Sequence, residues 1–304
     1  MNNINRLLVG LDLTSTDEYI IRYAAYFARL LKAEDLYFFH VVQSFELSDE
    51  IIEKYPFVKS PVDESLENKI QDLLEKHFDS SIQCNKHIEI KEGNPIEEII
   101  KWSKIKEIDL VFMGSKFTEN SSGTLPRKIV TIIPASILLV PENTFDSVSN
   151  ILVPIDFSET SKLALEAAIE IAGKTGGRIT CQHCFVVPHG YSTVGKSYEE
   201  FSGIMKENTQ KKFKDFIADI QTNINITEIC TLDKDDNPAK LIYNLAEAIQ
   251  ANLVIIGSKG RTGLASLILG SVAEKLMRYD KDIPLLVVKK KDEILDFFDA
   301  IHQL

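Results

Sequence analysis

Short apolar runs alternate with longer amphipathic segments along the chain. In the second half, the apolar runs fall at residues 151–156, 178–187, 226–232, 252–258 and 283–289. Runs of this length are typical of strands that are buried on both faces of a parallel sheet, and the segments between them supply the covering helices. The pattern therefore predicts an α/β fold with a doubly wound, five-stranded parallel sheet.

Local capping signals place the helices of the second half. Ser158 is a suitable N-cap for a helix that the glycines at 176–177 end, and Asn237 followed by Pro238 is typical of a cap and a first helical position. A long helix is expected over 197–221, with apolar residues at helical spacing: Phe201, Met205, Phe213, Phe216, Ile217 and Ile220.

The two halves of the chain repeat one another. NRLLVGLDLTST at 5–16 resembles NILVPIDFSETS at 150–161, and the stretch that ends in VFMGSK at 116 resembles the one that ends in VIIGSK at 259. Gly114 and Gly257 are 143 positions apart, which indicates duplication. A polar linker at 141–150 separates the copies, so we expect domains at 1–143 and 149–290 and an amphipathic helix at 291–304.

Composition narrows the class of protein. The 304 residues carry a net charge of -11, with 44% hydrophobic and 26% charged residues, which is normal for a soluble globular protein. The acidic balance argues against nucleic-acid binding. There is no apolar run of eighteen residues, and the first residues lack the features of a signal peptide. The four cysteines show no disulfide spacing, so we expect a cytoplasmic location.

The stretch GSKGRTGLASLILGS, residues 257–271, carries the clearest chemistry. It leaves the carboxyl end of the fourth strand and leads into a helix, which is where ligands bind in open α/β sheets. Glycines let a ligand approach the backbone, and a helix N-terminus offers free N–H groups. Lys259 and Arg261 add positive charge, so the sequence of this loop predicts a binding site for a phosphate group. It is neither a Walker A motif nor a well-placed dinucleotide fingerprint.

These residues also carry a family resemblance. The spacing Gly257-x2-Gly260-x9-Gly270-Ser271 resembles the signature of ATP-binding universal stress proteins, and VPIDFSETS looks like that family's first strand and turn. The resemblance covers about residues 2 to 290. It implies two Rossmann-like domains of the adenine-nucleotide alpha-hydrolase-like type, arranged as an intramolecular pseudo-dimer joined through their last strands.

The resemblance further implies a set of ligand contacts in the second half. Asp156 corresponds to the family's adenosine contact, Cys184 to a backbone contact with adenine, and Gly270 onward to the phosphate cradle. It implies ATP, with Mg²⁺ on the phosphates, bound by Pro154, Ile155, Asp156, Cys184, Ile256, Gly257, Lys259, Gly260, Arg261, Gly270, Ser271 and Val272.

The first half departs from this pattern. Asp12 is retained, but Gly10 replaces the proline, and Phe117 stands where the second glycine should be. The cradle from Gly114 to Gly123 is four residues shorter than the one from Gly257 to Gly270. A defective ATP site is therefore expected in the first half.

Alternative chemistries find less support. Cys181, His183, Cys184 and His189 suggest a metal site, but on a strand Cys181 and His183 point away from Cys184. A Ser271–His183–Asp156 triad lacks a nucleophile elbow. We therefore expect no catalytic residues and no protein-held metal.

The functional prediction is an ATP-binding stress or regulatory protein. The alternatives are a scaffold of the same fold that binds no nucleotide, and a slow ATPase. The segment 291–304 is apolar on one face and acidic on the other, which favours docking on this protein or on a partner over membrane binding. A protein partner or a homo-oligomer remains open.

Overall fold

The structure is a computed structural model of the full chain. It describes residues 4–44, 62–115, 124–142, 144–220, 222–260, 269–279 and 282–290. The chain divides into two compact units, a first unit over Asn2–Asp146 and a second unit over Ser147–Leu304. The amphipathic helix predicted at 291–304 lies outside the described residues.

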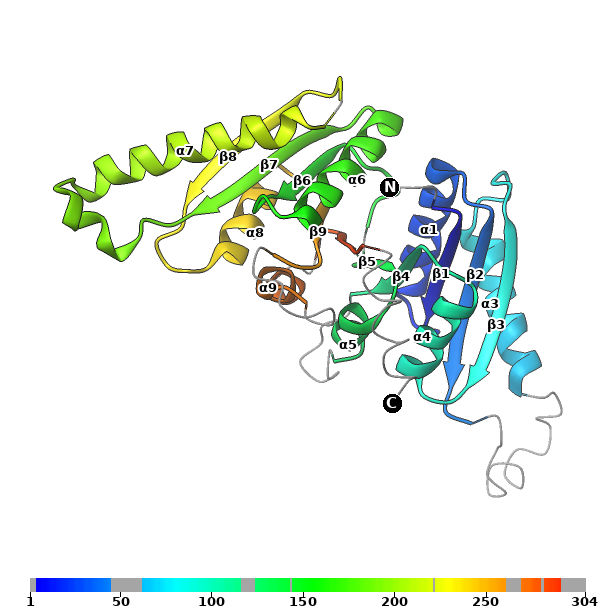
Figure 1. The fold of residues 1–304 in the computed structure, drawn as a ribbon. Helices are drawn as coiled ribbons and strands as arrows, with labels where there is room; N and C mark the ends of the chain where they lie inside the picture. Colours follow the sequence, from blue (N-terminus) through cyan, green and yellow to red (C-terminus); the bar gives the residue numbers. More distant parts are fainter. Residues whose placement is uncertain are drawn as a thin grey trace. The chain divides into compact units, whose positions relative to one another are not determined.

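The first unit is an open parallel sheet with strand order β3-β2-β1-β4-β5 (Figure 1). Because the chain returns to the centre of the sheet after β3, the order reverses between β1 and β4. Its described elements are β1 (Arg6–Leu11), α1 (Asp17–Leu31), β2 (Asp35–Val42), α3 (Val62–His77), β3 (Asn85–Glu92), α4 (Pro95–Ile105), β4 (Leu110–Gly114), α5 (Thr124–Ile132) and β5 (Ser136–Val140).

The second unit repeats this topology with strand order β8-β7-β6-β9-β10, also parallel. The order reverses between β6 and β9. Its described elements are β6 (Asn150–Pro154), α6 (Glu159–Thr175), β7 (Arg178–Phe185), the 3₁₀ helix η1 (His189–Val194), α7 (Tyr198–Ala218), β8 (Ile226–Leu232), α8 (Pro238–Ala248), β9 (Leu253–Gly257), α9 (Ser271–Tyr279) and β10 (Leu285–Val288). The predicted α/β fold with doubly wound parallel sheets is confirmed, whereas the pseudo-dimer stays a prediction.

Helices cover both faces of each sheet. In the first unit α1 packs against α3 and α4 packs against α5, and in the second unit α8 packs against α9 (Figure 1). The central strands are buried on both faces, as their uninterrupted apolar sequences require: every residue from Leu253 to Gly257 is buried. Among the described residues, no helix is both long and apolar enough to cross a membrane.

The predicted helix boundaries agree with the structure. Ser158 caps α6 by accepting a hydrogen bond from the Ser161 amide, and Gly176 ends the helix in the left-handed region at φ 72°. Asn237 caps α8, with Pro238 at the first position. The apolar face expected on α7 is less buried than its periodicity indicates: of its apolar residues, Phe213 alone is buried among those the structure describes.

A matching polar contact fixes the start of the central strands in both units. The Asp109 carboxylate, just before β4, accepts hydrogen bonds from the Asn5 and Arg6 amides at 2.9 and 3.0 Å. Asn252, just before β9, accepts from the Ser149 and Asn150 amides, both at 3.0 Å. The duplication therefore preserves hydrogen bonds as well as topology.

Candidate functional site

A cavity of about 520 Å³ opens in the second unit at the carboxyl ends of β6, β7 and β9. It lies where the strand order reverses, which is the usual ligand position in open α/β sheets. The structure brings eleven of the twelve predicted residues to its lining, and Arg261 lies outside the described residues. The eleven are Pro154, Ile155, Asp156, Cys184, Ile256, Gly257, Lys259, Gly260, Gly270, Ser271 and Val272.

The turn after β6 holds Asp156 in a fixed orientation. Its Oδ1 accepts hydrogen bonds from the Ser158 amide at 3.0 Å and from the Ser158 hydroxyl at 2.5 Å. Phe157 takes a positive φ of 66°, an uncommon conformation for a bulky residue. His183 Nδ1 donates to the Ile155 carbonyl at 2.7 Å, and its ring packs against the Phe157 ring. His183 thus braces the turn that presents Asp156.

The first unit builds the same turn after β1. His40 Nδ1 donates to the Leu11 carbonyl at 2.9 Å, Leu13 takes a φ of 59°, and Asp12 Oδ1 accepts from the Thr14 amide and hydroxyl. His183 was not among the predicted ligand contacts. Its counterpart His40 in the first unit makes the matching hydrogen bond, which indicates that both histidines support the turn.

The glycines of the loop allow two close approaches. A Cβ on Gly257 would lie 2.7 Å from the Thr160 carbonyl carbon, so α6 could not pack on β9 as it does. A Cβ on Gly260 would lie 2.9 Å from Asp156 Oδ2. The Thr160 hydroxyl also donates to the Lys259 carbonyl at 2.5 Å. These contacts hold the segment Gly257–Gly260 beside the Asp156 turn.

The N-terminus of α9 closes one side of the cavity. The Gly270 amide donates to the Ser258 carbonyl at 2.7 Å, and the Gly270 carbonyl accepts from the Glu274 amide at 3.0 Å, so Gly270 is the N-cap. The next three residues, Ser271 to Ala273, line the cavity. Amides in a first helical turn have no carbonyl partner within the helix, and the helix dipole is positive there. This wall is suited to an anionic group.

Positive charge lies beside this wall. Lys259 lines the cavity, and Lys289 follows β10, whose Val288 carbonyl accepts from the Ser258 amide at 2.9 Å. Burial, and to a smaller extent the nearby Lys259 ammonium, lowers the pKa of Lys289 to about 7. A bound anion would favour the charged form of this lysine.

Several lining residues were missed by the sequence analysis. Gln182, Ser161, Asp236, Pro238 and Ile242 contribute to the wall of the cavity. Gln182 is 1% exposed and lies between Cys181 and His183 on β7. The repeat offered a signal, because the first half has Phe39 at the corresponding position before its own strand-end histidine.

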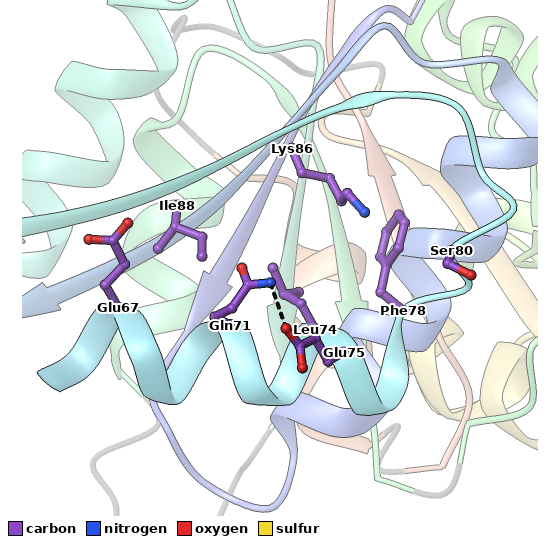
Figure 2. Close-up of a pocket in the computed structure, with 8 residues that line it drawn as sticks. All are labelled: Glu67, Gln71, Leu74, Glu75, Phe78, Ser80, Lys86 and Ile88. Carbon is purple, nitrogen blue, oxygen red and sulfur yellow. Dashed lines mark hydrogen bonds between the residues drawn. The ribbon is translucent and has the colours of Figure 1, made fainter. Parts of the chain in front are cut away.

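Two further pockets accompany this cavity. One of about 620 Å³ lies under α7 and shares His183, Cys184, Asp236 and Pro238 with the first. The other, of about 410 Å³, lies between α3 and β3 of the first unit, where Figure 2 shows Gln71 donating a hydrogen bond to Glu75. Lys86 lines this pocket too, with its ammonium 5.0 Å from the Phe78 ring centroid.

The thiols near the cavity are suited to packing rather than to chemistry. Burial, and to a smaller extent the Asp233 carboxylate, raises the pKa of Cys184 to about 12, so the thiol is neutral at physiological pH. Burial also raises the pKa of Cys181. Within the described ranges, no three His, Cys, Asp or Glu side chains are placed to hold a metal ion.

Comparison with known proteins identifies the family. The chain is 33% identical over 159 residues to universal stress protein MJ0531 of Methanocaldococcus jannaschii, covering 51% of this chain and 88% of that protein. It matches a universal stress protein structure from Archaeoglobus fulgidus with a TM-score of 0.61 and 21% identity, over 95% of this chain and 97% of that one.

A second solved structure has the same fold. Protein PA1789 from Pseudomonas aeruginosa, described as functionally unknown, matches with a TM-score of 0.68 and 15% identity, over 99% of this chain and 98% of that one. The sequence profile of the universal stress protein family matches this chain twice, at residues 3–138 and 148–289. The chain therefore belongs to the universal stress protein family and carries two of its domains in tandem.

Proposed function

We propose that the second unit binds ATP and that the nucleotide acts as a regulatory ligand. The observation that carries this proposal is the wall formed by the first turn of α9, with Lys259 beside it, in a cavity that eleven predicted contact residues line. Free amides and a cation stabilise phosphates. The Asp156 carboxylate is fixed by Ser158 and supplies an acceptor for the ribose or base.

We propose that Mg²⁺ binds together with the nucleotide, on its phosphate oxygens. The proposal needs no metal site built from carboxylates or histidines, because Mg²⁺ on a nucleotide is held mainly by phosphate oxygens and water. The Ser271 hydroxyl is the chain's own candidate ligand. The ion would neutralise phosphate charge.

A regulatory role follows from what the lining supplies. Rapid phosphoryl transfer needs a positioned base and an in-line nucleophile beside the γ-phosphate. The acidic side chains of the described lining are Asp156 and Asp236, and Asp156 already accepts two hydrogen bonds from Ser158. We infer that turnover is slow or absent and that binding sets the conformation of the loop.

One site per chain is expected because the first unit carries an acidic group at the equivalent place. Asp17 occupies the position that corresponds to the cavity-lining Ser161. Its side chain is buried, and it accepts hydrogen bonds from the Leu13 amide at 2.7 Å and the Asp12 amide at 3.3 Å. Burial, and to a smaller extent the neighbouring Asp12 carboxylate, raises the pKa of Asp17 to about 7. An acidic side chain in place of the Ser161 hydroxyl disfavours a phosphate-bearing ligand in the first unit.

Titration calorimetry of the full chain with Mg²⁺ and ATP tests the proposal. We expect one site per chain, which Gly270→Val abolishes by blocking the start of α9. Gly203→Val is the matched control, since a Cβ on Gly203 meets nothing within 4 Å. Two equivalent sites would contradict the single-site proposal, and absence of binding would favour the scaffold alternative.

Phosphate release separates a regulatory ligand from a substrate. The purified chain with Mg²⁺ and ATP should turn over far more slowly than about one per second, the lower end of ordinary enzymes. Faster release that disappears in Ser271→Ala would make the protein an ATPase.

A further inference from the structure

The side-chain amide of Gln182 is held in one orientation. Its Nε2 donates to the Thr231 hydroxyl at 2.9 Å and to the Leu241 carbonyl at 3.3 Å. A backbone carbonyl can only accept a hydrogen bond, so the nitrogen of the amide must face Leu241 and the oxygen must face away. The contacts from β8 and α8 therefore fix which end of the amide is which.

The oxygen of this amide lacks a partner. Gln182 Oε1 is buried and makes no hydrogen bond with any described residue. Gln182 is only 1% exposed, and it lines the cavity of the proposed nucleotide site. A buried acceptor without a donor is costly, whereas a ligand that supplies an N–H group removes that cost.

The fold itself does not require a polar group at this position. The corresponding residue of the first unit is Phe39, which is 1% exposed and packs against the Trp102 ring. Both residues directly precede the histidine that braces the first turn, His40 or His183. The same strand position thus accepts a fully apolar side chain, so the fold alone does not account for a buried amide oxygen that lacks a donor.

We propose that Gln182 reads the base of the nucleotide, a role that rests on the proposed function. Its Oε1 accepts a hydrogen bond from the exocyclic amino group at position 6 of adenine. A 6-oxo purine such as guanine or hypoxanthine presents an acceptor there and leaves both oxygens unsatisfied. Gln182 is then the residue that makes this cavity select adenine over other purines.

The depth of the oxygen adds a geometric condition. Because less than 1 Å² of Oε1 is exposed, a ligand reaches it by inserting its edge to the floor of the cavity and displacing neighbouring atoms slightly. A planar base can do this, but a group lying across the mouth cannot. Gln182 pairs with Pro154 across β6 and β7, so this floor lies directly below the Asp156 turn.

The test compares three triphosphates on the full chain by competition calorimetry. ATP carries the 6-amino group, purine riboside triphosphate carries hydrogen there, and inosine triphosphate carries oxygen. We expect ATP to bind about tenfold or more tightly than either, as for a hydrogen bond that satisfies a buried group. In Gln182→Met, of similar volume, the ratios should fall close to one.

Gln71→Met is the matched control, because Gln71 makes its hydrogen bond to Glu75 in the first-unit pocket of Figure 2. It should leave all three ratios unchanged. Equal binding of the three triphosphates by the unchanged chain would overturn the role of Gln182 while leaving nucleotide binding intact, and this comparison needs no variant. Failure of all three to bind would overturn the proposed function together with this inference.

Discussion

Gly257→Ala is the substitution whose cost the structure defines best. The added Cβ would lie 2.7 Å from the Thr160 carbonyl carbon, 2.8 Å from its oxygen and 2.8 Å from its hydroxyl. Two of these three atoms belong to the backbone of α6, near its start, so a side-chain rotation cannot relieve the clash. Either α6 moves away from β9 or the glycine loop shifts.

The magnitude follows from two opposing effects. Forcing a methyl group into a packed contact costs about 1–3 kcal/mol. Replacing glycine by alanine also restricts the unfolded chain, which stabilises by about 0.4–1 kcal/mol where the native backbone suits alanine. We expect Gly257→Ala to lower the free energy of unfolding of the second unit by about 1–2 kcal/mol.

Gly114 provides the control within the same chain, since it is the counterpart of Gly257 in β4. A Cβ there would meet only the side-chain tips of Thr16 at 3.1 Å and Ile20 at 3.3 Å, which can give way. Urea denaturation of the full-length variants should therefore show a smaller loss for Gly114→Ala. A loss at Gly114 equal to or greater than that at Gly257 would refute the argument from backbone contact.

Three further changes have expected outcomes. Asp17→Asn should stabilise the first unit by roughly 2–3 kcal/mol more at pH 8 than at pH 5 in urea denaturation. The pKa of Asp17 is about 7 in the folded protein and 3.8 in the unfolded chain, so the stability of the unchanged protein falls as the pH rises from 3.8 to 7. An equal stabilisation by Asp17→Asn at pH 5 and pH 8 would contradict this. Asn252→Ala should destabilise the second unit by about 1–2 kcal/mol in thermal and urea denaturation, because the Ser149 and Asn150 amides lose their acceptor. ATP binding at pH 8 should take up protons, because phosphates raise the lowered pKa of Lys289; calorimetry in buffers of different ionisation enthalpy measures this, and an unchanged uptake in Lys289→Met would count against it.

The features that the sequence predicted are those encoded by neighbouring residues. Helix caps act within one helical turn, so the starts of α6 and α8 could be predicted from the residue types of Ser158, Asn237 and Pro238. The loop from Gly257 to Ser271 could be placed because a strand and a helix flank it.

The features that escaped prediction depend on packing between distant segments. Gln182 becomes part of the cavity floor only because Leu241 of α8 and Thr231 of β8 come to lie beside it. The face of α8 that meets the cavity, which includes Ile242, is set in the same way. The apolar periodicity of α7 misled for a related reason: most residues of its apolar face stay half-buried, and Met205 among them lines a pocket.

The assembly of the cavity from separated segments also links the ligand to the lifetime of the protein. Its walls come from residues between Pro154 and Ala273, on six different elements and their connecting turns, so an unfolded second unit has no binding site. A ligand at 100 times its dissociation constant would lower the unfolded population of that unit about a hundredfold, close to 2.7 kcal/mol. If the proposed nucleotide binds here, proteases that cleave unfolded chains would remove the protein fastest when that nucleotide is scarce. The abundance of the protein would then follow the concentration of its ligand.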